Sequence, residues 1–151
     1  MGTTNINIKN RKAKFEFFIL AEYTAGIVLT GTEIKSVKAG KASIGESYCH
    51  FQKDELWIKN LHIAEYKFGS VNNHEPKRPR KLLLKRQELN KLQNKVKEKG
   101  LTIIALEMLV TERGFAKIKI ALAKGKKNFD KRHSIKDKDQ KRELDRDSKY
   151  Y

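Results

Sequence analysis

The sequence predicts a mainly β protein with helices, in the form of an OB-like antiparallel β-barrel with peripheral helices and a charged C-terminal tail. Up to Ala123, hydrophobic and polar residues alternate with the period of two that is typical of half-buried strands. The predicted strand over 56–63 is partly apolar on both faces, as expected for a closed or covered sheet. After Arg132 the only aliphatic residues are Ile135 and Leu144, and so few of them cannot bury enough apolar surface to offset the entropy of ordering the segment.

The chain therefore divides into three predicted segments. Residues 1–8 carry few apolar side chains and form a loose N-terminus, residues 9–127 form one barrel domain, and residues 128–151 form a basic tail. We expect the tail to be disordered in the free protein and to be ordered by a partner. At 151 residues the chain is long enough for one such domain with a single modest core.

Six short strands are predicted from runs of aromatic and aliphatic residues. They are Phe15–Leu20, Tyr23–Leu29, Ser47–Phe51, Leu56–Ile63, Leu101–Val110 and Phe115–Ala123. The third and fourth form a hairpin around Lys53-Asp54-Glu55, and the last two form the clearest hairpin, which turns at Glu112-Arg113-Gly114. In the sixth strand the aliphatic residues 118, 120 and 122 share a buried face, which leaves Lys117 and Lys119 on a cationic face.

Two helices are predicted within the domain. The first begins in Thr30-Gly31-Thr32-Glu33, with Thr32 as its N-cap, and it ends at Gly40. Its outer side presents three lysines, Lys35, Lys38 and Lys41. The second helix carries Leu89, Leu92 and Val96 on one side and is stopped by Gly100. Between the hairpin and the second helix we expect a loop at 66–73 and a basic segment at 76–81 whose prolines disfavour helix and regular strand.

The net charge of the chain restricts the classes of partner that it can bind. Thirty-four Lys and Arg against eighteen Asp and Glu give a net charge of +16 and a pI near 9.9, which favours nucleic acid or an anionic membrane surface. A membrane is the weaker choice, because no apolar run approaches the roughly 20 residues of a spanning helix. The N-terminus also lacks the pattern of a signal peptide, and a single cysteine, Cys49, fits a reducing cytoplasm.

Catalytic and metal chemistry find no support in the sequence. The four histidines, at positions 50, 62, 74 and 133, have no zinc-ligand spacing with Cys49 or with acids. No phosphate-binding glycine loop is present, and the carboxylates are scattered, whereas a metal-dependent nuclease requires them clustered. We therefore expect a binding protein with no catalytic residue, no metal and no cofactor.

Three basic or aromatic features allow two interpretations each. Residues 9–14 form either a solvated arm or a phosphate contact. Phe129 either stacks on an unpaired base or anchors the tail to the barrel. If the residues after His133 become helical, Ser134 and Asp137 have the spacing of a capping box. Such a helix would carry a basic stripe of Lys138, Arg142 and Arg146, which either meets phosphates or belongs to an ordinary charged helix.

A series of short motifs in a fixed order adds to the composition. The series comprises Asn10-Arg11-Lys12-Ala13, Ala25-Gly26-Ile27, Gly31-Thr32-Glu33-Ile34-Lys35-Ser36, Lys38-Ala39-Gly40-Lys41, Arg80-Lys81-Leu82-Leu83-Leu84, Gly114-Phe115-Ala116-Lys117, Ala123-Lys124-Gly125-Lys126-Lys127 and Asp130-Lys131-Arg132. With these motifs the chain closely resembles the small protein B (SmpB) family, the SsrA-binding proteins of bacterial trans-translation. The resemblance runs from Asn10 to about Arg146.

The resemblance implies an OB-like barrel that binds the tRNA-like domain of transfer-messenger RNA (tmRNA, or SsrA RNA). In the family the barrel stands in for missing parts of a tRNA, and the complex enters the empty A site of a stalled 70S ribosome. The tail then lies as a helix in the vacant mRNA channel, near the decoding centre of the small subunit. Elongation factor Tu with alanyl-tmRNA is implied as a partner in the same complex, in the bacterial cytoplasm, and the protein itself catalyses no bond change.

Together with the charge pattern, the resemblance gives the site residues. The candidate tmRNA-binding residues are Asn10, Arg11, Lys12, Glu33, Lys35, Lys38, Lys41, Arg80, Lys81, Lys117, Lys119, Lys124, Lys126 and Lys127. The candidate tail residues at the ribosome are Phe129, Asp130, Lys131, Arg132, Lys138, Arg142 and Arg146. Phe129 occupies a position that is histidine in some members, so a stacking role carries over, whereas a role that needs a ring nitrogen does not.

Composition alone leaves two other functions open. A structural ribosomal protein or a general single-stranded RNA-binding protein with an OB fold would show no preference for a tRNA-like fold. An RNA-processing enzyme would show metal-dependent turnover that is lost when a carboxylate such as Glu33 is replaced.

Overall fold

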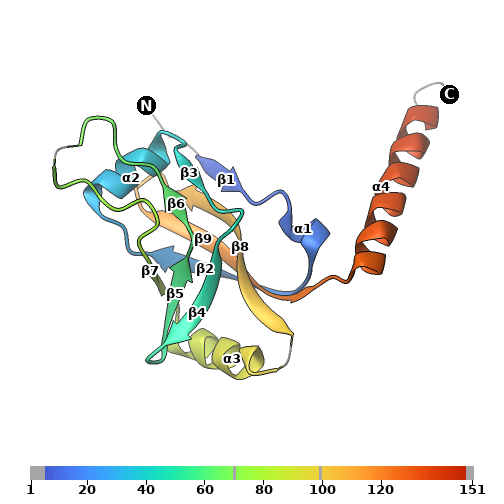
Figure 1. The fold of residues 1–151 in the computed structure, drawn as a ribbon, viewed down its shortest axis with the longest axis horizontal. Coiled ribbons are helices and arrows are strands. Elements are labelled where there is room, and N and C mark those ends of the chain that lie inside the picture. Colours follow the sequence, from blue (N-terminus) through green and yellow to red (C-terminus); the bar gives the residue numbers. More distant parts are fainter. Residues whose placement is uncertain (1–5, 70, 99, 149–151) are drawn as a thin grey trace.

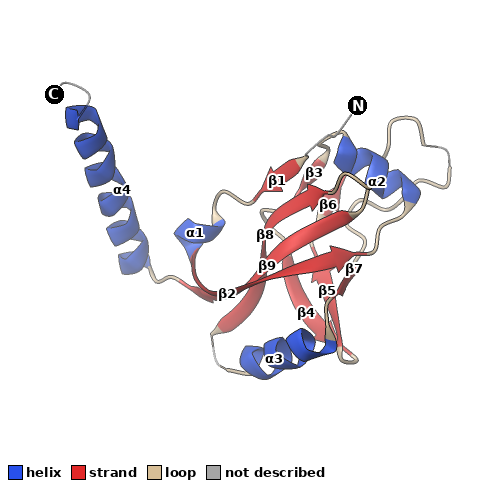
Figure 2. Ribbon diagram, turned by 180° about the vertical axis from the view of Figure 1, so that it is seen from behind, coloured by secondary structure: helices blue, strands red, loops and turns tan. Residues whose placement is uncertain are grey.

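The computed structural model describes residues 6–69, 71–98 and 100–148. These residues form a mainly antiparallel sheet that closes in a ring, with a second small sheet and helices around it (Figure 1 and Figure 2). The strands of the large sheet are β1 (Asn7–Lys9), β2 (Phe17–Ile27), β4 (Tyr48–Gln52), β5 (Glu55–Lys59), β7 (Arg80–Leu83), β8 (Leu101–Val110) and β9 (Ala116–Gly125). The small sheet consists of β3 (Ala42–Ser43) and β6 (His62–Ile63), and the helices are α1 (Ala13–Glu16), α2 (Gly31–Lys38), α3 (Arg86–Val96) and α4 (Asn128–Ser148).

The ring closes because β9 pairs with a long strand on each side. The strand order is β1-β8-β4-β5-β7-β2-β9, and β8 pairs in addition with β9. β2 and β9 pair from Phe17 opposite Gly125 to Gly26 opposite Lys117, with one irregularity between Ile19 and Ala21. The expected hairpin of β8 and β9 is confirmed, and Gly114 occupies its turn with a positive φ of 86°.

Aliphatic side chains fill the inside of the ring. Ile118, Ile120 and Leu122 of β9 are buried, as their alternation predicted. The predicted helix α3 is confirmed, and it adds Leu89 and Leu92 to the same core. Burying one such side chain contributes about 1.5–3 kcal/mol relative to leaving it exposed. α2 and α3 lie at opposite ends of the sheet, while α4 projects away from it (Figure 1).

The expected strand over 56–63 is wrong in one respect, because it is interrupted at Asn60. Asn60 has a positive φ of 59°, which ends β5 at Lys59 and starts β6 two residues later. An unbroken strand would put Leu61 on the face of Trp57, opposite Ile58. The interruption shifts that alternation, so Ile58 and Leu61 are both fully buried.

Two further expectations about local structure need correction. Of the residues 1–8 that were expected to be loose, residues 7 and 8 belong to β1 and pair with β8, while residues 1–5 lie outside the described part of the chain. Ala13–Glu16 form the unpredicted helix α1. The N-cap of α2 is Thr30 instead of Thr32, since the Thr30 hydroxyl accepts from the Glu33 amide. Gly40, with a φ of 74°, follows the end of that helix as predicted.

The C-terminal segment forms one long helix, α4, over Asn128–Ser148. Since the helix begins at Asn128, Ser134 lies in its interior and does not start it; the side chain of Ser134, on which the expected capping box depends, lies outside the described side chains. Asp137 lies instead 3.7 Å from His133, one turn earlier. None of the described helices combines the length and apolar character needed to cross a membrane.

Candidate nucleic-acid interface

Lys117 and Lys119 lie on the outer side of β9, opposite the aliphatic residues that fill the ring. Lys117 is exposed, and its cross-strand neighbours on β2 and β8 are uncharged. Lys119 is half-buried and lies opposite Glu107 of β8, a pairing of opposite charges. Of the two, Lys117 is therefore the better placed to meet a phosphate.

The N-terminal basic segment lies beside this face. Asn10, Arg11 and Lys119 line one surface hollow of about 410 Å³. The other charged residues around this N-terminal hollow are Lys9, Lys14, Glu22 and Glu107. The tertiary structure thus joins two predicted basic segments from opposite ends of the domain into one surface with a cationic excess.

Asn10 has a structural role that its sequence position did not reveal. The pairing of β8 with β9 is irregular between Ala105 and Glu107, which takes carbonyl groups out of the ladder. The Asn10 amide group donates to the Ala105 carbonyl at 2.9 Å, and its backbone amide donates to the Leu106 carbonyl at 2.8 Å. The Asn10 Oδ1 atom is buried without a hydrogen-bond partner among the described residues, so it is an acceptor that a ligand hydroxyl or amino group would satisfy.

Glu33 and Arg80 lie inside the molecule. Both side chains have 0% exposure, and they form an ion pair with each other. Arg80 also donates to the Leu61 and Pro76 carbonyls. Neither side chain reaches solvent in this structure, so both predicted RNA contacts lie behind the surface that a partner would meet.

The environment of Glu33 keeps its carboxylate ionised. Burial by itself raises the pKa of Glu33, but hydrogen bonds from Arg78, the Thr30 amide and Arg80 outweigh it and hold the pKa below its ordinary value. Burial likewise lowers the pKa of Arg80, and the Glu33 carboxylate opposes that effect. The pair fixes α2 to β7, across a separation of 47 residues in sequence.

A second contact fixes the first turn of α2. The His74 Nε2 atom lies 2.9 Å from the Ile63 carbonyl, so this nitrogen must be the donor. In the neutral ring the His74 Nδ1 atom then accepts from the Thr32 hydroxyl, 2.8 Å away. Thr32, the residue that the sequence suggested as N-cap, therefore joins α2 to the segment that follows β6.

These internal contacts leave the three lysines of the α2 segment exposed. Lys35, Lys38 and Lys41 all lie on the surface, as predicted. The Lys35 ammonium lies 5.4 Å from the centre of the Tyr66 ring, in a cation–π contact. Lys38 reaches the β8–β9 turn, where a side chain added at Gly114 would approach its ammonium group to 3.3 Å.

An apolar groove that the sequence analysis missed lies near Lys38. Val28, Leu83 and Phe115 are exposed large apolar residues in this groove of about 550 Å³, and Lys117 lines it as well. The Leu82-Leu83-Leu84 run contained a signal for it, because successive strand residues point to opposite faces and Leu83 must face outward when Leu82 is buried. An exposed apolar surface rimmed by cations suits the faces of unpaired bases.

Lys81 and Lys12 differ in how available they are. Lys12 is exposed beside the N-terminal hollow. The Lys81 ammonium forms an ion pair with Glu55 of the neighbouring strand, at a partly exposed site. An exposed ion pair of this kind contributes about 0–1 kcal/mol, so it would not prevent Lys81 from changing partner.

Residues 124–127, which are the last two residues of β9 and the two that join it to α4, are here called the tail root. Lys124 and Lys127 are exposed, whereas Lys126 is half-buried and contacts α1 and β2. The Lys127 amide donates to the Asp130 carboxylate at 3.2 Å, a contact that caps the first turn of α4. Asp130, which the sequence suggested as a ribosome contact, therefore also stabilises the helix.

The remaining tail residues lie along α4. Phe129 is 69% exposed, so its ring does not anchor the tail to the sheet in this structure. Arg132, Lys138 and Arg142 are exposed, Lys131 is half-buried, and the side chain of Arg146 lies outside the described side chains. The helix thus presents three of the predicted cations, Arg132, Lys138 and Arg142, fully to solvent over the part that is described.

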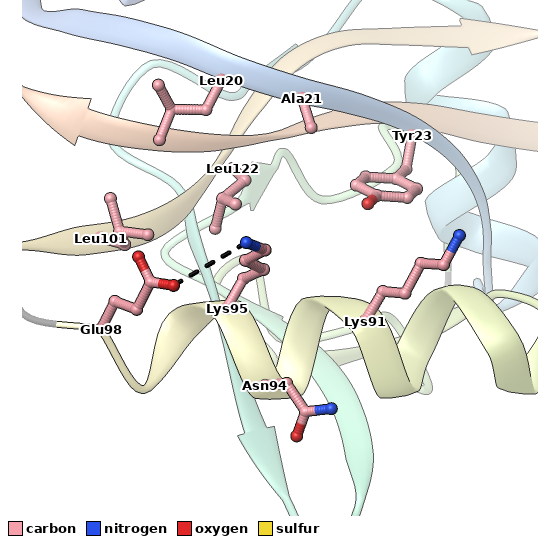
Figure 3. Close-up of a pocket in the computed structure, with 9 residues that line it drawn as sticks. All are labelled: Leu20, Ala21, Tyr23, Lys91, Asn94, Lys95, Glu98, Leu101 and Leu122. Carbon is pink, nitrogen blue, oxygen red and sulfur yellow. Dashed lines mark ion pairs between the residues drawn. The ribbon is translucent and has the colours of Figure 1, made fainter.

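A further hollow of about 410 Å³ lies between α3 and β2 (Figure 3). Its floor is apolar, with Leu20, Leu101 and Leu122, and Lys91 and Lys95 project from α3 at its rim. Glu98, the acid that lines it, pairs with Lys95 at 3.8 Å. None of the predicted site residues lines this hollow.

The potential nucleophile and metal ligands are dispersed. Burial raises the pKa of the Cys49 thiol, which therefore stays protonated and unreactive. Burial also lowers the pKa of the neighbouring His50, an effect to which Lys59 adds. Over residues 6–69, 71–98 and 100–148, no three His, Cys, Asp or Glu side chains come together as a metal site.

Comparison with known proteins gives a consistent result along the whole chain. The family model described as "SmpB protein" matches residues 7–150. An SsrA-binding protein from Cytophaga hutchinsonii is 61% identical over 142 residues, which is 94% of this chain and 93% of the relative. The SsrA-binding protein of Phocaeicola vulgatus is 56% identical over 146 residues, which is 97% of each chain.

A solved structure gives the same result in three dimensions. One chain of the structure described as "tmRNA-SmpB: a journey to the center of the bacterial ribosome" is similar to this fold with a TM-score of 0.70. The two chains share 43% sequence identity, and the similarity covers 86% of this chain and 94% of the other.

Proposed function

The chain belongs to the SmpB family, and we propose that it is an SsrA-binding protein that acts with tmRNA on ribosomes in trans-translation. The observation that carries this proposal is the similarity to SsrA-binding proteins over 97% of the chain. The similarity extends over both the body (residues 9–127) and the tail (residues 128–151). In this role the protein binds and positions RNA, and it makes or breaks no bond itself.

The body binds the tRNA-like domain of tmRNA. Three surface features support this assignment: the N-terminal hollow with Asn10 and Arg11, next to the exposed Lys12; the outer lysines of α2; and the apolar groove that Lys117 lines. Cations at the rims would contact phosphates, while Leu83 and Phe115 would contact base faces. Glu33 and Arg80 hold α2 in place for these contacts.

The closed sheet is an OB-like barrel that replaces missing parts of a tRNA. Its ring of six strands and the helices at its ends form a body from which α4 extends, as Figure 2 displays. Elongation factor Tu with alanyl-tmRNA binds in the same complex, which enters the A site of a stalled 70S ribosome in the bacterial cytoplasm.

The C-terminal tail contacts the ribosome. It lies in the vacant mRNA channel, with Asp130, Lys131 and Arg132 near the decoding centre of the small subunit. The exposed ring of Phe129 stacks on ribosomal RNA, and the stripe of Lys138, Arg142 and Arg146 meets phosphates. In the free protein we expect the helix beyond its capped first turn to be only weakly stable, because it has few aliphatic residues to bury, and to be ordered fully by the ribosome.

The decisive experiment compares the full chain with a chain that ends at Asn128. Residues 129–151 carry eight Lys or Arg and six Asp or Glu, so the truncation lowers the net charge only from +16 to +14. We expect unchanged binding of the tRNA-like domain in a gel shift and abolished tagging of the nascent chain on stalled ribosomes in vitro.

The controls separate the competing functions. An unrelated tRNA-sized hairpin RNA should bind much more weakly than the tRNA-like domain. Equal binding of both RNAs would instead identify a general RNA-binding protein. Loss of binding together with tagging would show that the tail belongs to the RNA-binding surface.

A further inference from the structure

The tail root contains one lysine whose cation is directed toward the protein itself. The Lys126 ammonium donates to the Lys14 carbonyl at 2.9 Å and lies 5.1 Å from the centre of the Phe18 ring. The Lys126 backbone amide donates to the Glu16 carbonyl, also at 2.9 Å. A single residue therefore contacts α1 and the start of β2 at three points.

The partners of Lys126 have a reason to bind it. α1 has only four residues, so the carbonyl groups at its C-terminal end lack partners within the helix. Lys14 and Glu16 supply two of these carbonyls, and both accept from Lys126. The face of the half-exposed Phe18 ring adds a second attraction for the same cation.

These contacts lie where the chain changes direction. β9 ends at Gly125, opposite Phe17, and α4 begins at Asn128. α1 lies beside the chain that leads into α4 (Figure 1). Fixing Lys126 to α1 therefore fixes the direction in which the first turn of α4 leaves the sheet.

We propose that Lys126 is a positioning residue that holds the tail root against α1 and Phe18, and that it is not an RNA contact. It differs in this from Lys124 and Lys127, whose side chains are exposed. The inference rests on the proposed function in one point, namely that the tail must point into the mRNA channel for tagging. The contacts of Lys126 with α1 and Phe18 do not depend on the proposed function, because they form within the protein alone.

The test uses four variants of the full chain. Lys126→Met keeps the length and the apolar stem but removes the charge and the donor, while Lys126→Arg keeps both. Phe18→Leu removes the ring but stays apolar. Lys136→Met is the charge-matched control, since Lys136 lies on α4 beyond the root and outside the candidate site residues.

Two measurements follow the function of each variant. We expect Lys126→Met to bind the tRNA-like domain as Lys136→Met does, but to lower the tagging rate at saturating tmRNA complex roughly tenfold. Lys126→Arg keeps the charge and the donor, so it should tag at about the rate of the unsubstituted protein. Phe18→Leu should also lower the tagging rate. The double variant Phe18→Leu/Lys126→Met should lose less than the sum of the two single losses in activation free energy, because both changes remove the same interaction.

A third measurement needs no ribosome. Spin labels at Glu112→Cys, in the β8–β9 turn, and at Arg132→Cys, at the end of the first turn of α4, report the direction of the tail root; Cys49 is buried and does not compete for the label. Double electron–electron resonance on the free protein should give a narrow distance distribution that Lys126→Met broadens and Lys136→Met does not.

Two outcomes would overturn the inference. One is a broad distribution in the unsubstituted protein, which would mean that Lys126 holds nothing. The other is a loss of RNA affinity in Lys126→Met with the distribution still narrow, which would make Lys126 an RNA contact. Failure of the proposed function itself would look different, since the unsubstituted protein would then support no tagging and would not prefer the tRNA-like domain, whatever the label distances.

Discussion

At the scale of single residues, the main finding is that two predicted RNA contacts are a buried ion pair. Glu33 and Arg80 have the charges of a surface site, but the structure encloses both. Arg80 also donates to two backbone carbonyls, which satisfies most of its guanidinium group. A buried charge that loses its partner leaves the other charge uncompensated, so we expect these two residues to act first on the stability of the fold.

We therefore expect Glu33→Gln to destabilise the fold by about 3–5 kcal/mol, as measured by urea unfolding. The matched control is Glu55→Gln, which removes the partly exposed pair with Lys81 and should cost about 0–1 kcal/mol. RNA affinity of the folded fraction should change little. Unaltered stability together with weakened RNA binding would show that Glu33 reaches RNA after all.

The same carboxylate predicts a pH dependence. Because the pKa of Glu33 is lowered in the folded state, its contribution is fully present above its unfolded pKa of about 4.3. The contribution is lost as the pH falls through the folded pKa. The free energy of unfolding should therefore decline more steeply below about pH 4 in the unsubstituted protein than in Glu33→Gln, and the two curves should converge at low pH. Parallel curves would exclude this ion pair as the cause.

At the scale of elements, α4 begins as an ordinary capped helix. Asp130 accepts from the Lys127 amide, and the Lys131 amide donates to the Lys127 carbonyl, which closes the first turn. An acid in the first turn also interacts favourably with the helix dipole. The Asp130-Lys131-Arg132 motif thus carries a helix start as well as charges for a partner.

We expect Asp130→Ala to weaken the helix start by roughly 1 kcal/mol, which should lower the helical signal of the full chain in circular dichroism. Asp130→Asn keeps an acceptor oxygen and should retain part of that signal. Tagging should follow the same order among the variants. An equal loss of tagging in both variants, with the helical signal unchanged, would assign Asp130 to a contact on the ribosome.

At the scale of the whole molecule, the charge lies in the body. The tail after Asn128 accounts for only two of the sixteen net positive charges, because its cations and acids nearly balance. The body therefore supplies the long-range attraction for RNA, which falls with ionic strength. Within the body, Lys117 is exposed next to the apolar groove, while other lysines such as Lys53 lie in distant turns.

The salt dependence of tmRNA binding tests whether Lys117 contacts a phosphate while a lysine in a distant turn does not. Lys117→Gln should reduce the slope of log affinity against log salt concentration by about 0.7–0.9, the value for one phosphate contact. Lys53→Gln, which removes the same charge at the β4–β5 turn, should leave the slope almost unchanged. Equal reductions in both variants would mean that net charge, and no particular surface, governs binding.

The features that depend on neighbours along the chain were predictable from the amino-acid sequence. The alternation of residues 118–122 identified β9 and its inward face, the spacing of Leu89, Leu92 and Val96 identified α3, and the motif series identified the family. These features were predictable because strand and helix periodicity are properties of a few consecutive residues. The exposed lysines of α2 followed for the same reason.

Which charged residues face inward was not predictable from the sequence and became clear from the folded structure. Glu33 and Arg80 meet across 47 residues, Asn10 reaches Ala105 across 95, and Lys126 reaches Lys14 across 112. No local pattern encodes such pairs, because they depend on which strands become neighbours when the ring closes. A charged side chain has the same local signature whether it faces RNA, an opposite charge or a backbone carbonyl, and the packing around it determines which of the three it meets.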